Sequence, residues 1–230
     1  MNIHARTATA ASRMDIERAR FNMVEQQIRT WEVLDASVLD LLLRVHREDF
    51  VPEQHRALAF VDMEIPLGHG EVMLSPKLEA RMLQEVAVRR SDTILEIGTG
   101  SGYMTALLAS LGRHVYSVDM VSEFTRAAAD CLAAHDIRNV TLETGDAARG
   151  WDQHGPYDVI VLTGSVPVLP DSFRQSLNPG GRLLAVVGEP PAMAARLITC
   201  ISAGSIQATS LFETCIPPLR NALQPQRFVF

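Results

Sequence analysis

Hydrophobic residues recur with a helical period through the N-terminal third of the chain. Residues 14–60 alternate apolar and charged positions, and Asp35 is a suitable N-cap for a helix. That helix is expected from apolar residues at i, i+3, i+4 and i+7 spacing, namely Val38, Leu39, Leu42 and Val45. Pro52 is expected to end the segment, because proline cannot continue a helix interior. Residues 61–76 hold two prolines and two glycines, which predicts a structured loop before a second amphipathic helix beyond Pro76.

The pattern changes at Thr93, where short β-branched runs begin to alternate with helical stretches. Strands are predicted at Thr93–Ile97, His114–Val118, Val140–Thr144, Asp158–Leu162 and Arg182–Val187. Helices are predicted between them, near Tyr103–Ser110, Ser122–His135 and Asp171–Ser176. This alternation predicts an α/β fold, doubly wound around a mostly parallel sheet, with the N-terminal helices as a cap. The tail, Ser205–Ile216 and Arg227–Phe230, is expected to form antiparallel strands at one sheet edge.

Composition narrows the class of protein without choosing a function. The chain has 230 residues, 47% of them hydrophobic, and a net charge of −6, which disfavours nucleic acid and anionic membranes as partners. No apolar run approaches the ~20 residues that a transmembrane helix needs. Three widely spaced cysteines indicate neither a disulfide framework nor a zinc ribbon. A cytoplasmic protein without a metal is expected, and its oligomeric state is not indicated.

The predicted domain organisation is simple. Residues 1–13 lack the apolar stretch of a secretory signal, so we expect a disordered leader, with Met14 as a candidate start. Residues 14–230 are expected to form one domain. Within it, residues 14–90 would supply the helical cap and a substrate loop, and residues 91–230 the ligand-binding core.

A glycine-rich turn between the first predicted strand and its helix is the clearest functional signal. Gly98, Gly100 and Gly102 alternate between Ile97 and Tyr103. Glycines at such positions permit a tight turn and let a ligand approach the backbone. The dinucleotide fingerprint Gly-x-Gly-x-x-Gly would require its third glycine at Tyr103, so the spacing does not favour NAD.

Acidic residues at the ends of the first three predicted strands indicate a cationic ligand. Glu96 stands two residues before Gly98, where a carboxylate would repel a pyrophosphate but suit the sulfonium and ammonium of S-adenosylmethionine. Asp119 follows Gly102 by 17 residues, the place from which an acid can accept hydrogen bonds from ribose hydroxyls. Asp146 is a candidate partner for the adenine amine, or alternatively a helix N-cap.

These motifs resemble those of the protein-L-isoaspartate (D-aspartate) O-methyltransferases over roughly residues 18 to 219. The likeness lies chiefly in Pro66–Gly70, Leu95–Tyr103, Val115–Asp119, Gly145–Asp146, Pro156–Thr163 and Pro179–Arg182. The resemblance implies a Rossmann-like methyltransferase fold, S-adenosyl-L-methionine as cofactor and isoaspartyl carboxylates of damaged proteins or peptides as substrate. By position it implies cofactor contacts at Glu96, Gly98, Thr99, Gly100, Ser101, Gly102, Asp119, Met120, Asp146 and Ala147.

The substrate loop departs from the family pattern. After Gly-His-Gly the family usually has Gln-Thr-Ile-Ser-x-Pro, whereas this chain places Val72 and Leu74 at the threonine and serine positions. Ser75 is one residue late, so it is a catalytic candidate only if the loop shifts. The predicted substrate loop comprises Gly68, His69, Leu74 and Ser75.

Two kinds of acceptor therefore remain open. One is the isoaspartyl carboxylate, which is ionised near neutral pH and needs no general base. The other is a less polar small molecule, such as a phenol or a quinone-like hydroxyl compound, for which His69 is the candidate base. A third hypothesis is that the protein binds the cofactor but is not an enzyme. A dinucleotide oxidoreductase and a metal-dependent methyltransferase are disfavoured by the glycine spacing and by the lack of clustered carboxylates.

Overall fold

The computed structural model describes residues 14–202 and 204–226. The predicted leader, residues 1–13, and the predicted strand Arg227–Phe230 lie outside the described residues. No helix in the described part of the chain is both long and apolar enough to cross a membrane.

The N-terminal region is helical but more broken than the sequence predicts. A helix over residues 14–22 continues as π-helix η1 (Met23–Ile28) and 3₁₀-helix η2 (Arg29–Trp31). Asp35 caps α2 (Ala36–Arg44) as expected, because its carboxylate accepts hydrogen bonds from the next turn's amides. The expectation that Pro52 ends this helix is wrong, since α2 already stops at Arg44. Two 3₁₀-helices follow, η3 (Arg47–Asp49) and η4 (Glu53–Leu58).

The predicted loop over residues 61–76 contains an antiparallel hairpin. Its strands are β1 (Ile65–Gly68) and β2 (Glu71–Met73), paired from Ile65 with Met73. Gly68, His69 and Gly70 all adopt positive φ, which turns the chain sharply between the two strands. α3 (Pro76–Val86) then begins with proline in its first turn, as predicted.

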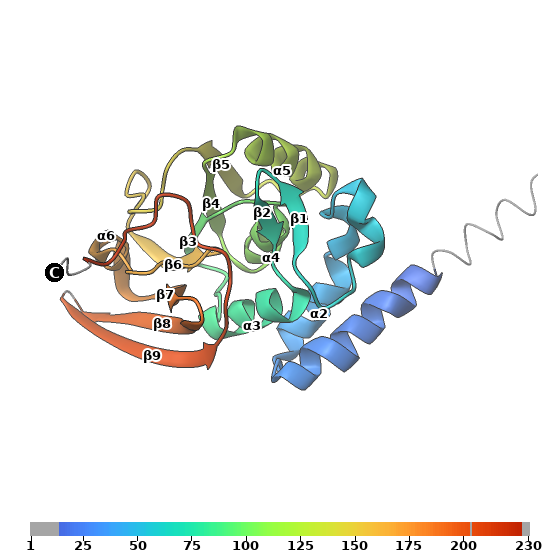
Figure 1. The fold of residues 1–230 in the computed structure, drawn as a ribbon, viewed down its shortest axis with the longest axis horizontal. Coiled ribbons are helices and arrows are strands. Elements are labelled where there is room, and N and C mark those ends of the chain that lie inside the picture. Colours follow the sequence, from blue (N-terminus) through green and yellow to red (C-terminus); the bar gives the residue numbers. More distant parts are fainter. Residues whose placement is uncertain (1–13, 203, 227–230) are drawn as a thin grey trace, which may run out of the picture.

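Within residues 14–202 and 204–226, seven strands form one sheet in the order β5-β4-β3-β6-β7-β8-β9 (Figure 1). The first five in that order are parallel and β8 and β9 are antiparallel, which confirms a mostly parallel, Rossmann-like sheet. The strands are β3 (Thr93–Ile97), β4 (His114–Asp119), β5 (Val140–Thr144), β6 (Tyr157–Leu162), β7 (Leu177–Glu189), β8 (Ala192–Ser202) and β9 (Ser205–Glu213). The intervening helices are α4 (Tyr103–Leu111), α5 (Ser122–Ala134) and α6 (Asp171–Gln175).

The antiparallel edge is confirmed, but its pairing differs from the expectation. β9 pairs with β8, a strand that the sequence reading missed, and β8 pairs with a β7 that is longer than predicted. Buried and exposed residues alternate only loosely along β8, so its sequence lacks the clear two-residue period that predicts a strand.

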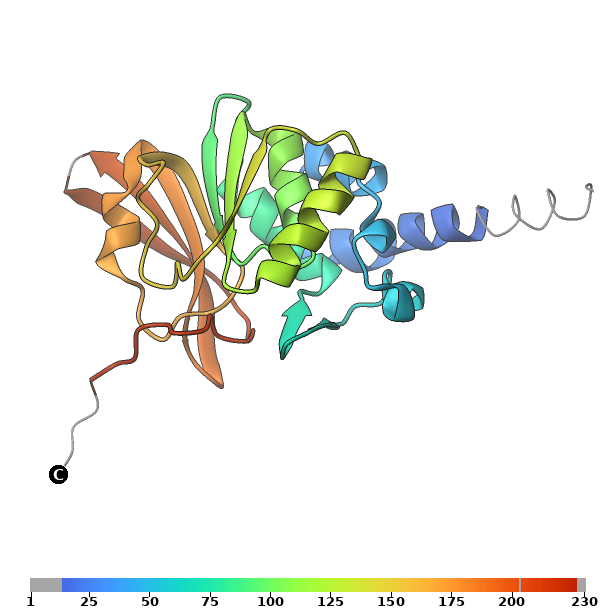
Figure 2. The same ribbon diagram turned by 90° about the horizontal axis from the view of Figure 1, so that it is seen from above.

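The two faces of the sheet pack against different layers. Ile94, Val159 and Leu184 belong to a core shared with the N-terminal helices, α3, α4 and α5. On the opposite face, Leu95 and Ile160 pack with Phe173 of α6. Figure 2 shows these layers, with the N-terminal helices in blue and α6 in orange on opposite sides of the sheet. A pocket lies at the carboxyl ends of the central strands, between the hairpin and the C-terminal segment, residues 217–220.

Candidate active site

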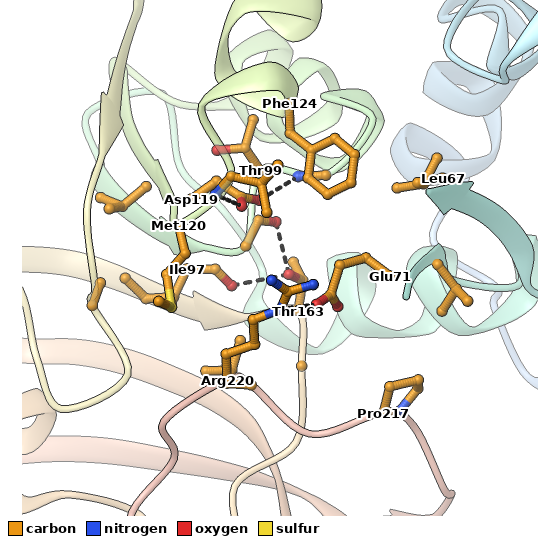
Figure 3. Close-up of a pocket in the computed structure, with 18 of the residues that line it drawn as sticks. Leu67, Glu71, Ile97, Thr99, Asp119, Met120, Phe124, Thr163, Pro217 and Arg220 are labelled. Carbon is orange, nitrogen blue, oxygen red and sulfur yellow. Dashed lines mark hydrogen bonds and ion pairs between the residues drawn. The ribbon is translucent and has the colours of Figure 1, made fainter. Parts of the chain in front are cut away.

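A single pocket collects most of the predicted functional residues. It lies at the carboxyl ends of β3, β4 and β6, where parallel α/β sheets bind ligands. The β1–β2 hairpin forms one wall and residues 217–220 form another (Figure 3). The space between these walls, counted together with the open mouth, is about 910 Å³.

The glycine loop forms the floor of this pocket. Gly98 and Gly100 have φ angles of +99° and +50°, a region that side chains with a Cβ rarely adopt. A Cβ at Gly98 would lie 2.2 Å from the hydroxyl oxygen of Thr163. A Cβ at Gly100 would project toward the hairpin, 3.2 Å from Leu67. Gly100 therefore keeps open the space between the loop and the hairpin, where a ligand can meet the backbone, whereas Gly98 lets the loop approach Thr163.

Asp119 is fixed at the centre of the pocket by backbone donors. One carboxylate oxygen accepts a 2.9 Å hydrogen bond from the amide of Gly100, and the other accepts one from Val121 at the same distance. Burial nevertheless raises the pKa of Asp119 above its ordinary value. Each oxygen keeps a second acceptor site, so a pair of vicinal hydroxyls can bind here.

Asp146 lies at the other end of the floor and is tied to the C-terminal segment. It accepts a 3.1 Å hydrogen bond from the amide of Ala148. No helix follows, because residues 146–150 form a turn, so the alternative prediction of a helix N-cap is wrong. The second oxygen of Asp146 accepts a 2.9 Å hydrogen bond from Asn221. Thr99, Ser101, Met120 and Ala147 also line the pocket, and their contact with a cofactor stays a prediction.

Two predicted cofactor residues do not line the pocket. Glu96 is fully buried and its side chain faces α4, where it accepts a hydrogen bond from Thr105. Burial raises the pKa of Glu96 to about 8. A Cβ at Gly102 would lie 2.9 Å from that of Ala128, so this glycine lets α5 pack against the loop. Contact of Glu96 or Gly102 with a ligand stays a prediction.

The substrate loop is brought to the pocket only in part. Val72 and Leu74 line it with apolar side chains, whereas Gly68, His69 and Ser75 do not. Ser75 instead precedes the first turn of α3, and its carbonyl accepts hydrogen bonds from that turn. The ring of His69 packs edge-on against Phe124 with centroids 5.5 Å apart. Catalytic roles for Ser75 and His69 stay predictions, with these structural roles beside them.

A buried ion pair beneath Leu74 was not foreseen. Arg47 is fully buried and forms an ion pair with Glu79, which itself lines the pocket. The guanidinium also donates to the carbonyls of Leu74 at 2.6 Å and Ala59 at 3.0 Å. Burial raises the pKa of Glu79 to about 7, although Arg47 opposes the shift. The sequence held one signal, a charged residue within the apolar stripe of α3.

The C-terminal segment closes the pocket from the far side and was also missed as a site. Arg220 forms an ion pair with Glu71 of the hairpin, with 2.5 Å between Nε and Oε1. It also donates to the carbonyl of His69. Residues 149 positions apart meet in this contact, so no local pattern announces it. Other lining residues that the sequence did not indicate include Leu67, Phe124, Thr163, Pro217, Pro218 and Leu219.

The sheet order and the acid-lined glycine pocket together define a Rossmann-like methyltransferase fold. A family model for protein-L-isoaspartate(D-aspartate) O-methyltransferase matches residues 18–221, and the chain belongs to that family.

Individual relatives agree with this assignment. The protein-L-isoaspartate O-methyltransferase of Myxococcus xanthus is 40% identical over 156 residues, 68% of this chain and 74% of the relative. Protein-L-isoaspartate O-methyltransferase 1 of Rhodopseudomonas palustris is 38% identical over 202 residues, which are 87% of this chain and 82% of the relative. A Plasmodium falciparum structure of the same description, solved with S-adenosyl-L-homocysteine, superposes with a TM-score of 0.75. The two sequences are 18% identical, and the superposition covers 87% of this chain and 98% of the Plasmodium chain. At this level of identity the likeness supports the fold alone.

Proposed function

We propose that this protein transfers a methyl group from S-adenosyl-L-methionine to the free carboxylate of isoaspartyl residues in damaged proteins or peptides. The observation that carries the proposal is the pocket floor, where two glycines with positive φ lie beside Asp119. Family membership over residues 18–221 supplies the reaction type. A cytoplasmic location agrees with this substrate.

The residues of the pocket fit this cofactor. A Cβ at Gly100 would fill the space beside Leu67, and the acids in the wall suit a ligand with a sulfonium and an ammonium. Gly98, Thr99, Gly100 and Ser101 would hold the amino-acid part, Asp119 and Met120 the ribose, and Asp146 and Ala147 the adenine. When bound, the cofactor supplies an electrophilic methyl group.

The chain's own contribution is alignment of the acceptor. A carboxylate with an ordinary pKa near 4 is already a nucleophile at neutral pH, so no residue needs to remove a proton. Proximity and orientation alone can lower such a barrier by up to about 7–11 kcal/mol. His69, on the hairpin outside the pocket lining, is therefore not required as a base.

An apolar small-molecule acceptor is the second candidate. It is supported by one observation, that Val72 and Leu74 line the pocket where the family usually has hydroxyls. The family match over residues 18–221 does not favour it.

The deciding experiment compares two peptides of one sequence, with either isoaspartyl or ordinary aspartyl at one position. We expect methyl transfer from labelled S-adenosylmethionine to the isoaspartyl peptide, forming a base-labile ester, and none to the aspartyl peptide. Tight binding of S-adenosylhomocysteine without transfer to the isoaspartyl peptide would contradict the proposed substrate and leave the cofactor assignment standing.

A further inference from the structure

The pocket is well suited to a cation and poorly suited to the acceptor. Four of the charged residues in its lining are acidic, namely Glu71, Glu79, Asp119 and Asp146. The cofactor carries two positive groups, a sulfonium and an ammonium, and one negative carboxylate. Its net positive charge is therefore attracted by the acidic lining. Glu79 is paired with Arg47 and Glu71 with Arg220, so an isoaspartyl carboxylate that approaches the same pocket meets repulsion chiefly from Asp119 and Asp146. It therefore needs a cation of its own.

The side chains at the positions of the family's threonine and serine offer no donor to such a carboxylate. Val72 and Leu74 line the pocket with apolar side chains, and Ser75 lies outside the lining. Leaving a carboxylate against apolar side chains without a donor is costly, because its desolvation is not compensated. Among the described residues that line the pocket, Arg220 is the one with a cationic side chain.

Arg220 is held in place by both walls of the pocket. Its backbone follows Leu219, whose amide donates to the carbonyl of Ser165 at 2.9 Å. Its guanidinium donates to Glu71 of the hairpin across the pocket (Figure 3). It also donates to the carbonyl of His69. These contacts use two of the five N–H donors of a guanidinium, which leaves others for a ligand. With its side chain 43% exposed, the group remains accessible from the pocket mouth.

We propose that Arg220 binds the carboxylate of the isoaspartyl acceptor and determines specificity for it. Arg220 takes over the role of the threonine and serine hydroxyls that the family usually has where this chain has Val72 and Leu74. This inference rests on the proposed function. Glu71 orients the guanidinium and balances its charge while no acceptor is bound. A charge-assisted contact of this kind fixes the oxygen that attacks the methyl group, because a guanidinium can hold a carboxylate in one plane.

The test measures binding of two peptides to the complex of the protein with S-adenosylhomocysteine. One peptide carries isoaspartate and the other carries isoasparagine, which has the same shape without the charge. In Arg220→Ala we expect the isoaspartyl peptide to bind about tenfold more weakly or worse, and the isoasparaginyl peptide to change less than about twofold. Arg220→Lys should restore part of the loss, because it keeps the charge.

Kinetics and two further variants complete the test. In Arg220→Ala the KM for the isoaspartyl peptide should rise by a larger factor than kcat falls. Glu71→Gln should lower that KM, since it removes a competing carboxylate but keeps an acceptor for Arg220. Arg138→Ala is the matched control, because Arg138 is an exposed arginine paired with Asp136 and remote from the pocket lining. It should behave as the wild type does.

Three outcomes would overturn the inference. If the KM of Arg220→Ala is unchanged while the wild type turns over normally, the contact between Arg220 and the acceptor is ruled out, and the proposed function still stands. Equal weakening of both peptides, or weaker binding of S-adenosylhomocysteine, shows that Arg220 only holds the pocket walls together. A wild-type protein that neither binds nor methylates the isoaspartyl peptide defeats the proposed function, and this result is recognised before any variant is made.

Discussion

The two sides of the pocket are built in different ways. The proposed cofactor side consists of the carboxyl ends of β3 and β4, where Asp119 accepts a hydrogen bond from the backbone of Gly100, 19 residues away. The proposed acceptor side joins the β1–β2 hairpin to residues 217–220 through Arg220 and Glu71, which are 149 residues apart. The first is a local turn that a few glycines specify. The second exists only when distant segments pack.

This difference in construction explains why the glycine loop keeps the family pattern and the hairpin departs from it. A turn with positive φ at Gly98 and Gly100 leaves few residues that fit. The hairpin wall needs only side chains that pack, so Val72 and Leu74 can replace hydroxyls while Arg47 still holds the Leu74 carbonyl.

Gly100→Val should abolish measurable binding of S-adenosylhomocysteine. A β-branched residue is strained at φ +50°, and its Cβ would enter the space beside Leu67. We expect calorimetry to show at least about a 1,000-fold loss, equivalent to about 4 kcal/mol. Gly180→Val is the matched control, because Gly180 also has positive φ but nothing lies within 4 Å of its Cβ position. Equal affinity in Gly100→Val and the wild type would refute the loop assignment.

Arg47→Met should destabilise the acceptor side and the whole fold. It leaves the Glu79 carboxylate buried without its partner and removes the donors to Leu74 and Ala59. Loss of one member of a buried ion pair costs about 3–5 kcal/mol, measurable by urea unfolding. The double variant Arg47→Met/Glu79→Leu should recover part of this loss. A double variant less stable than Arg47→Met would contradict the pairing.

Asp119→Ala should weaken cofactor binding while the sheet remains folded. The variant removes a charged acceptor for two ribose hydroxyls and frees the amides of Gly100 and Val121. Hydrogen bonds to charged groups are worth about 1.5–3 kcal/mol, so affinity for S-adenosylhomocysteine should fall about 10- to 100-fold. Wild-type affinity in calorimetry, with a normal circular dichroism spectrum, would remove Asp119 from the ribose site.

Glu96→Gln should have the smallest effect on binding and a pH-dependent effect on stability. Burial raises the pKa of Glu96 from 4.5 to about 8, so the folded protein keeps a proton that the unfolded chain releases. This group's contribution to stability is therefore complete below about pH 4.5 and is lost as pH rises to about 8.

Glutamine cannot titrate, so the advantage of Glu96→Gln over the wild type in urea unfolding should grow from pH 5 to pH 8. A constant difference across this range would show that Glu96 ionises normally. Affinity for S-adenosylhomocysteine should change little, because Glu96 does not line the pocket. A large loss would support the direct contact with the cofactor that the sequence predicts.

Much of the cofactor side was predictable from the sequence. Alternating strands and helices, alternating glycines and acids at strand ends depend on neighbours close along the chain. They identified Gly98, Gly100, Asp119 and Asp146, all of which line the pocket. The reading failed where partners are distant, as at β8, whose pairing with β7 and β9 decides its conformation.

By itself, the sequence determined the α/β class, the glycine turn and the family to which the chain belongs. Only the tertiary structure decided which side chains reach the pocket. It directed Glu96 into the core, put Leu74 rather than Ser75 in the wall, and brought Arg220 to Glu71. The physical reason is that local backbone preferences act over a few residues, whereas burial and charge pairing depend on segments that meet only when the chain folds.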